Sequence, residues 1–227
     1  MVGSLPIRIL KQPNAGGLEL LDDYTLLTTQ LVTLWSVMDP IGHVPLFLSA
    51  TAALNFADRR RTAVIGVAAA YGLLAAFGLV GPFVLKAMGI SLLSFQIAGG
   101  MILFVFALSM VLGNSAASST TAGEGTLATA IYPIATPIIA GPGAMLTIAL
   151  LMDNQREALS RQAITLLALA GILTLLLGAF LLSEWIHRII GVGGSNLLRR
   201  VMGLILSALA VNMVVSALAI WLHLPEI

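Results

Sequence analysis

The chain has 227 residues, of which 59% are hydrophobic and only 9% are charged, and its mean hydropathy is +1.02. A soluble domain normally carries about a quarter charged residues, so this composition excludes an ordinary water-exposed surface and predicts a protein embedded in a lipid bilayer. The net charge of +1 offers no electrostatic surface to nucleic acid, and the absence of cysteine excludes thiol chemistry and cysteine-ligated metals.

After residues 1–23, the chain contains apolar stretches that are long enough to span a membrane. Residues 1–23 contain two prolines and a glycine pair, and they predict an irregular tail. A helix needs about twenty apolar residues to cross the hydrocarbon core. Stretches that meet this length lie at residues 24–57, 62–85, 92–113, 125–152, 162–183 and 201–222. The sequence therefore predicts an all-α, polytopic membrane protein with six transmembrane helices.

The polar segment at residues 114–124 divides these stretches into two halves, residues 24–113 and residues 125–223. Each half has three spans, which is an odd number, so the second half would enter the membrane in the opposite orientation. Such a pattern predicts a 3+3 inverted repeat, with the substrate site near the midplane between the halves. Chance similarity among apolar helices is the alternative.

The first and fourth stretches are the longest, and prolines and glycines interrupt both of them: SVMDPIGHVPLF begins at Ser36 and YPIATPIIAGPGAM begins at Tyr132. Aligning Pro40 with Pro142 brings Gly100 close to Gly203. A proline inside a helix lacks an N–H and clashes with the carbonyl four residues earlier. The carbonyls expected to lose their helical partners are those of Ser36, Ile41, Thr129, Pro133 and Ile138.

These interruptions predict discontinuous first and fourth helices. Non-helical backbone at membrane depth is tolerated only where protein buries it or where it lines a polar cavity. Two breaks in corresponding positions therefore predict a binding site where they meet. The small side chains of Gly42, Ala135, Thr136 and Ala140 predict that this site is narrow.

Asp39 is the one acidic residue in the middle of a predicted span. Acids inside membranes are usually functional, which favours a role facing the substrate or a proton. An Asp before a Pro is also the expected N-cap of a helix, so capping alone is the alternative. His43 lies four residues on; it either shares a helix face with Asp39 as a proton-sensitive pair or is satisfied by a backbone carbonyl.

Gly141-Pro142-Gly143 repeats this helix start without an acid. The amides of Gly143, Ala144 and Met145 then offer positive partial charge to a carboxylate, while freed carbonyls suit an ammonium group. A tight kink needed only for packing is the alternative. The predicted substrate-binding residues are Asp39, Pro40, Gly42, His43, Pro45, Thr136, Pro137, Ala140, Gly141, Pro142, Gly143 and Ala144.

The two motifs resemble those of the MarC family of bacterial inner-membrane proteins. They read Asp39-Pro40-Ile41-Gly42-His43-Val44-Pro45 and Pro133-Ile134-Ala135-Thr136-Pro137-Ile138-Ile139-Ala140-Gly141-Pro142-Gly143, and His43 departs from the Asn that is usual in the family. The resemblance covers about residues 24–223. It implies a carrier in the bacterial inner membrane, in SnatA-like members for glycine, alanine and related small neutral amino acids, coupled to a proton or a cation.

The leading hypothesis is a secondary transporter of a small zwitterion. A carrier or channel for an inorganic ion and a structural membrane protein remain open alternatives. An enzyme is not expected, because the sequence has no H-E-x-x-H motif, no cysteine and no recognisable Ser, His and Asp set at membrane depth. The expected partners are the lipid bilayer, a small zwitterionic solute and a proton or cation, with no metal, cofactor or nucleic acid; the residues do not indicate an oligomeric state.

The orientation is predicted from the basic residues beside the spans. Arg59, Arg60 and Arg61 form a cluster directly after the first stretch. Lys and Arg are enriched in cytoplasmic loops, so this loop is expected in the cytoplasm and both termini outside.

Overall fold

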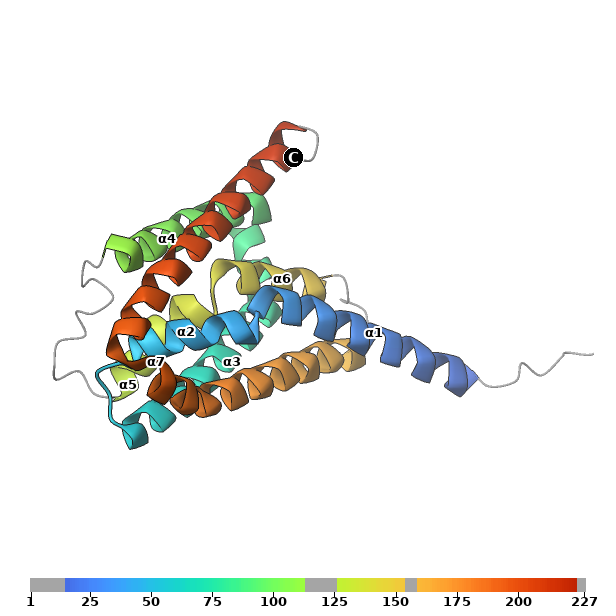
Figure 1. The fold of residues 1–227 in the computed structure, drawn as a ribbon. Helices are drawn as coiled ribbons and strands as arrows, with labels where there is room; N and C mark the ends of the chain where they lie inside the picture. The colour runs from blue at the N-terminus through green and yellow to red at the C-terminus, as the bar shows by residue number, and fades with distance from the viewer. Residues whose placement is uncertain (1–14, 113–125, 154–158, 224–227) are drawn as a thin grey trace, which may run out of the picture.

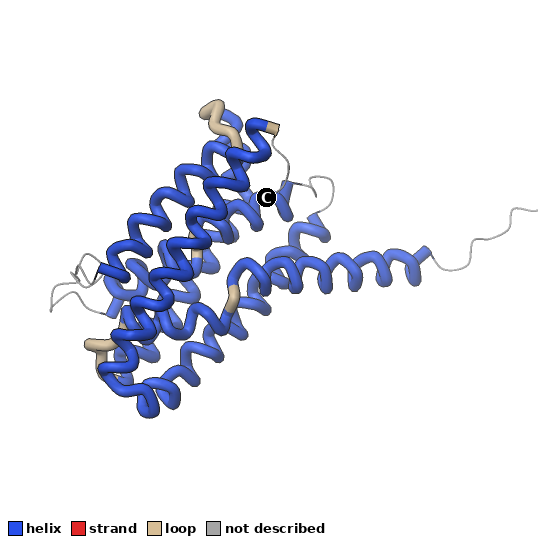
Figure 2. The backbone as a smooth tube through the Cα atoms, turned by 45° about the horizontal axis from the view of Figure 1, so that its top comes forward, coloured by secondary structure: helices blue, strands red, loops and turns tan. Residues whose placement is uncertain are grey.

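The structure is a computed structural model that describes residues 15–112, 126–153 and 159–223, and this part of the chain is helical without any β-strand (Figures 1 and 2). In chain order, the elements are α1 (Ala15–Met38), α2 (Pro40–Ala50), α3 (Phe56–Ala87), α4 (Leu92–Leu112), α5 (Thr126–Thr129), η1 (Ala130–Ile139), α6 (Pro142–Asp153) and α7 (Leu159–Leu222).

Four helical segments within the described ranges are long and apolar enough to cross a membrane: Phe56–Ala87, Leu92–Leu112, Gln162–Ser183 and Arg200–Leu222. Two bent pairs raise the number to six if each pair is one span. Tyr24–Met38 and Gly42–Ala50 meet at 47°, and Thr126–Ile139 and Pro142–Met152 meet at 64°. The predicted all-α membrane fold is confirmed, with four to six spans.

Both predicted breaks are present, and a proline begins the second half of each broken span. Pro40 starts α2 and Pro142 starts α6. Proline suits this position because its fixed φ matches a helix and its missing N–H would have had no partner there. The fourth span is also irregular before its break, since η1 has wide turns and Tyr132 and Thr136 adopt extended φ and ψ angles inside it.

The helix that contains the first span begins earlier than predicted. Residues 15–23 were expected in an irregular tail, but α1 begins at Ala15. The last proline before it is Pro13, and the sequence from Leu18 onward has good helix formers, so nothing prevents a helix there. Residues 1–14 and the predicted polar segment at 114–124 lie outside the described residues.

The end of the first span is also earlier than predicted. α2 ends at Ala50, not near residue 57, and a short turn leads to Asn55. The Asn55 side chain accepts a hydrogen bond from the Asp58 amide (2.9 Å), which makes it the N-cap of α3. The arginine cluster therefore lies in the first turns of α3, not in a loop.

α7 contains the last two predicted spans in one helical element. Its first part (orange) and its last part (red) run in different directions in Figure 1. The last part lies beside α4, and these two helices share the most extensive interface between any pair of elements.

Two glycines allow α4 and the end of α7 to approach closely. A Cβ built on Gly100 would lie 3.0 Å from the Ala210 carbonyl oxygen and 2.8 Å from Val214 Cγ2. A Cβ built on Gly203 would lie 3.0 Å from the Ala107 carbonyl oxygen and 2.9 Å from Val111 Cγ2. The same sequence offset relates all three pairs of positions, glycine to glycine, alanine to alanine and valine to valine. This reciprocal contact is compatible with the predicted 3+3 inverted repeat.

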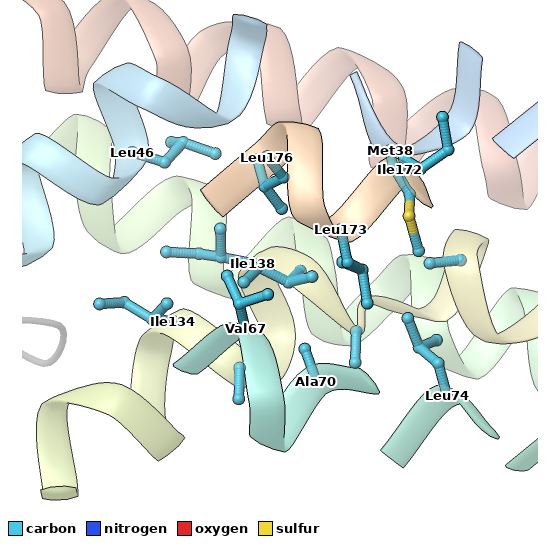
Figure 3. Packing of buried hydrophobic residues seen from close by; sticks show 14 of the residues in the cluster. Met38, Leu46, Val67, Ala70, Leu74, Ile134, Ile138, Ile172, Leu173 and Leu176 are labelled. Atoms are coloured by element: carbon cyan, nitrogen blue, oxygen red, sulfur yellow. The ribbon is translucent and has the colours of Figure 1, made fainter. Parts of the chain in front are cut away.

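The hydrophobic core surrounds the two broken spans. Figure 3 shows Met38 and Leu46 beside Ile172 and Leu176, with Ile138 of η1 between them and α3. All of these side chains are buried. Phe47 of α2 also stacks on Phe180 of α7, with 4.2 Å between the ring centroids. Protein therefore encloses the part of the irregular backbone next to the break, residues Ile138, Ile139 and Ala140, as a membrane environment requires.

Candidate functional site

A cavity of about 480 Å³ lies where the two breaks meet. One side of it comes from the junction of α1 and α2, and another from the junction of η1 and α6. α4 and the last part of α7 complete the wall. Eight of the twelve predicted site residues line it: Asp39, Gly42, His43, Pro137, Gly141, Pro142, Gly143 and Ala144.

The other four predicted residues do not line the cavity. At the N-cap and along α2, the lining positions are Asp39, Gly42, His43 and Leu46, which have the spacing of one helix face. Pro40 and Pro45 fall on other faces, and Pro45 lies inside α2 without breaking it. On the other broken span, the backbone turns Thr136 and Ala140 away, and Ala140 is buried in the core.

Asp39 both caps α2 and lines the cavity. Its Oδ1 accepts a hydrogen bond from the Gly42 amide (3.1 Å), so the expected N-cap is present. Its backbone is left-handed, with φ 31° and ψ 75°. A Cβ on Gly42 would overlap the Asp39 carboxyl group, which explains why the capped turn has glycine there. Capping therefore does not remove the carboxyl group from the site.

His43 connects the two broken spans. Its Nδ1 lies 2.9 Å from the Asp39 carbonyl oxygen, and its Nε2 lies 2.8 Å from the Ile138 carbonyl oxygen. Ile138 precedes Pro142 by four residues, so its carbonyl is one of those expected to lose a helical partner. A single backbone carbonyl was expected to satisfy His43. The structure has two such carbonyls, one from each broken span.

The start of α6 lacks an acidic cap. Gly141 occupies the position that Asp39 has in the other break, and a Cβ on it would lie 2.7 Å from the Pro137 carbonyl oxygen. The Met145 amide, which was expected to be available, donates to the Gly141 carbonyl oxygen at 2.9 Å. The amides of Gly143 and Ala144 belong to the first turn, where a helix provides no backbone acceptor. These two amides are the available donors of this helix end.

Gln96 of α4 belongs to the site although it was not among the predicted residues. Its Nε2 donates to the Met213 carbonyl oxygen (2.9 Å), and its side chain lines the cavity. Thr147 also lines the cavity, while its hydroxyl donates to the Gly143 carbonyl oxygen (2.8 Å). The sequence offered one signal that could have identified Gln96 as a site residue, namely its polar side chain within an otherwise apolar stretch.

The expectation of a narrow site was wrong. The cavity volume lies within the usual range for small-molecule sites, about 300–1,000 Å³. Ala135 and Thr136 do not line it, and its far wall consists of larger apolar side chains: Leu103, Phe106, Met202, Leu206 and Met213. Apolar residues in apolar helices gave no signal that they would face a cavity.

The family model described as MarC family integral membrane protein matches residues 24–222. The chain belongs to the MarC family. Its similarity to the UPF0056 membrane protein YhcE of Escherichia coli is 28% identity, over 86% of this chain and 93% of the relative. The UPF0056 inner membrane protein YhgN of Escherichia coli is 31% identical, over 84% of this chain and 95% of that protein. A UPF0056 membrane protein of Methanocaldococcus jannaschii is 34% identical, over 82% of this chain and 92% of the relative.

No solved structure matches the chain. The family match confirms the resemblance that the two motifs indicated, and with it a protein embedded in a lipid bilayer.

Proposed function

We propose that this MarC-family protein is a secondary transporter of small neutral amino acids, with its substrate site between the two broken spans. The observation that carries the proposal is one cavity lined both by Asp39 and by the first turn of α6, whose amides have no acceptor within the helix. A zwitterion needs these two kinds of partner at once.

The carboxylate of the substrate is assigned to α6. The amides of Gly143 and Ala144 point along the helix start, where the helix dipole adds positive partial charge. Gly141, in place of an acidic cap, leaves this end without a carboxyl group of its own. Thr147 lies one turn further along the same cavity wall.

The ammonium group is assigned to the opposite side of the cavity. Asp39 supplies a carboxyl group there, and its position at the α1–α2 junction keeps it facing the cavity. A polar group in a low-dielectric site needs a partner, so this pairing also reduces the cost of removing the substrate from water.

The side chain of the substrate is assigned to the apolar wall. Leu103, Phe106 and Met213 form part of it, and the described residues that line the cavity include no Lys, Arg or Glu. A substrate with a charged side chain would therefore lack a direct partner, whereas glycine, alanine and somewhat larger aliphatic amino acids would fit the chemistry of the wall.

Transport by purified protein in proteoliposomes tests the proposal. Labelled glycine, alanine, valine and leucine are offered under an imposed proton or sodium gradient, with lysine and glutamate as charged controls. We expect gradient-driven accumulation of at least one neutral amino acid and none of the charged ones. Failure to accumulate any neutral amino acid would contradict the proposal, and electrical currents independent of amino acids would favour an inorganic ion as the substrate.

A further inference from the structure

The ring of His43 is held between two backbone oxygens that come from different broken spans. Nδ1 is 2.9 Å from the carbonyl oxygen of Asp39, and Nε2 is 2.8 Å from that of Ile138. Carbonyl oxygens only accept hydrogen bonds. A neutral imidazole donates through one nitrogen and presents a lone pair at the other, whereas an imidazolium donates through both. The observed geometry therefore satisfies both contacts only when the ring carries an extra proton.

We propose that His43 is the binding site for the coupling proton of this carrier, and that the bound proton ties α2 to η1. The proposal rests on the proposed transport function and names its coupling ion. Histidine suits this task because its proton exchanges within the physiological pH range.

The contacts around His43 give the proton a structural effect. With the proton bound, the ring bridges the Asp39 and Ile138 carbonyls and connects the two sides of the cavity. Without it, one nitrogen presents a lone pair to a carbonyl oxygen, so one of the two contacts becomes repulsive. The contact with Ile138 joins α2 to η1, so its loss would let these two segments separate. A carrier needs such a change between its two access states.

Asp39 is the one ionisable side chain besides His43 among the described residues that line the cavity. η1 contributes Tyr132 and α7 contributes Arg200 among the described side chains, and neither lines the cavity. The side chains of Arg161, Glu184, His187, Arg188 and Arg199 on α7 are not described.

The charge balance of the site favours crossing with the proton bound. With Asp39 ionised, the cavity has one negative charge, and a zwitterion leaves this total unchanged. One proton on His43 cancels it. Moving a neutral site through the membrane interior costs less than moving a charged one, so the protonated site is the one expected to cross.

The test measures proton movement and amino acid movement in the same proteoliposomes. A pH-sensitive dye inside the vesicles reports protons while a neutral amino acid flows down its gradient. The unsubstituted protein should acidify the vesicle interior in proportion to uptake. His43→Gln keeps a donor for the Ile138 carbonyl and cannot bind the proton, so amino acid flow should no longer acidify the interior of its vesicles.

His223→Gln is the matched control, because His223 is exposed after the end of α7 and does not line the cavity. It should keep the ratio of the unsubstituted protein. An unchanged ratio in His43→Gln would overturn the proton site and leave the transport function intact, whereas absence of uptake by the unsubstituted protein would contradict the function itself.

A spectroscopic readout tests the proton site without transport. In protein labelled with ¹⁵N-histidine, the His43 signals are those missing from His43→Gln. At acidic pH both ring nitrogens should carry protons, and raising the pH should remove one. A ring that stays neutral across the pH range where the protein is folded would overturn the proposal.

Discussion

Substitutions of Asp39 can separate its role as the N-cap of α2 from the role of its charge. The carboxyl group accepts a hydrogen bond from the Gly42 amide, and the residue has a left-handed backbone with φ 31°. Asn can fulfil both requirements, since it is as good an N-cap as Asp and tolerates this conformation. Ala can fulfil neither. Asp39→Asn therefore removes only the charge, and Asp39→Ala removes the cap as well.

The expected difference in stability follows from two contributions. Loss of an N-cap to Ala typically costs about 1 kcal/mol. Placing Ala in a left-handed conformation adds roughly 1–2 kcal/mol. Asp39→Ala should therefore lower the free energy of unfolding by about 2–3 kcal/mol, whereas Asp39→Asn should lower it by only about a few tenths of a kcal/mol.

Unfolding in mixed detergent, followed by circular dichroism, measures the stability of both variants. Uptake into proteoliposomes at equal amounts of folded protein measures their function. We expect Asp39→Asn to be nearly as stable as the unsubstituted protein but to have lower uptake, because the ammonium group loses its carboxyl partner. Equal destabilisation by Asn and Ala would refute the capping argument, and full uptake by Asp39→Asn would show that Asp39 only caps the helix.

Other predictions use glycines and two positions near the ends of helices. Gly143→Ala places a methyl group in the cavity without a clash, since the atoms nearest to the new Cβ are 3.9 Å away. It should therefore reduce uptake at unchanged stability. Gly72→Ala is the control and should transport normally, because its Cβ would have nothing within 4 Å. Gly203→Ala should lower the free energy of unfolding by about 1–3 kcal/mol, because its Cβ would press on a backbone carbonyl and a rigid valine, and a stability equal to that of Gly72→Ala would contradict this packing. The chain has no cysteine, so single cysteines can report the orientation. With the first loop in the cytoplasm, Ala53→Cys should resist an impermeant maleimide added to intact cells, whereas Ala87→Cys should react. The reverse result would place the first loop outside.

The breaks were predictable because their cause is local. Pro40 follows the capping residue Asp39 and Pro142 lies between two glycines, so each favours a new helix start, and both patterns are visible in the sequence. The same holds for the Asp39 cap, which depends on residues three positions apart. The all-α class followed from composition and span length alone.

Contacts between distant segments were not predictable in the same way. The second carbonyl at His43 belongs to Ile138, which is 95 residues away in the sequence. The apolar wall from α4 and α7 also depends on how these helices cross, and apolar residues facing lipid look the same in a sequence as apolar residues facing a cavity. The helical start of α1 was missed because two prolines and a glycine pair in residues 1–23 indicate irregular backbone, whereas the helix includes the glycine pair.

The reciprocal glycine contact also bears on how the cavity opens. At Gly100 and Gly203, the backbone of each helix lies directly on the other, and a valine of the partner closes the gap on each side. Sliding one helix along the other would lift both valines out of place together. We therefore expect α4 and the end of α7 to keep their relative position, and any opening of the cavity to involve the segments that begin or end beside it, α2, η1 and α6.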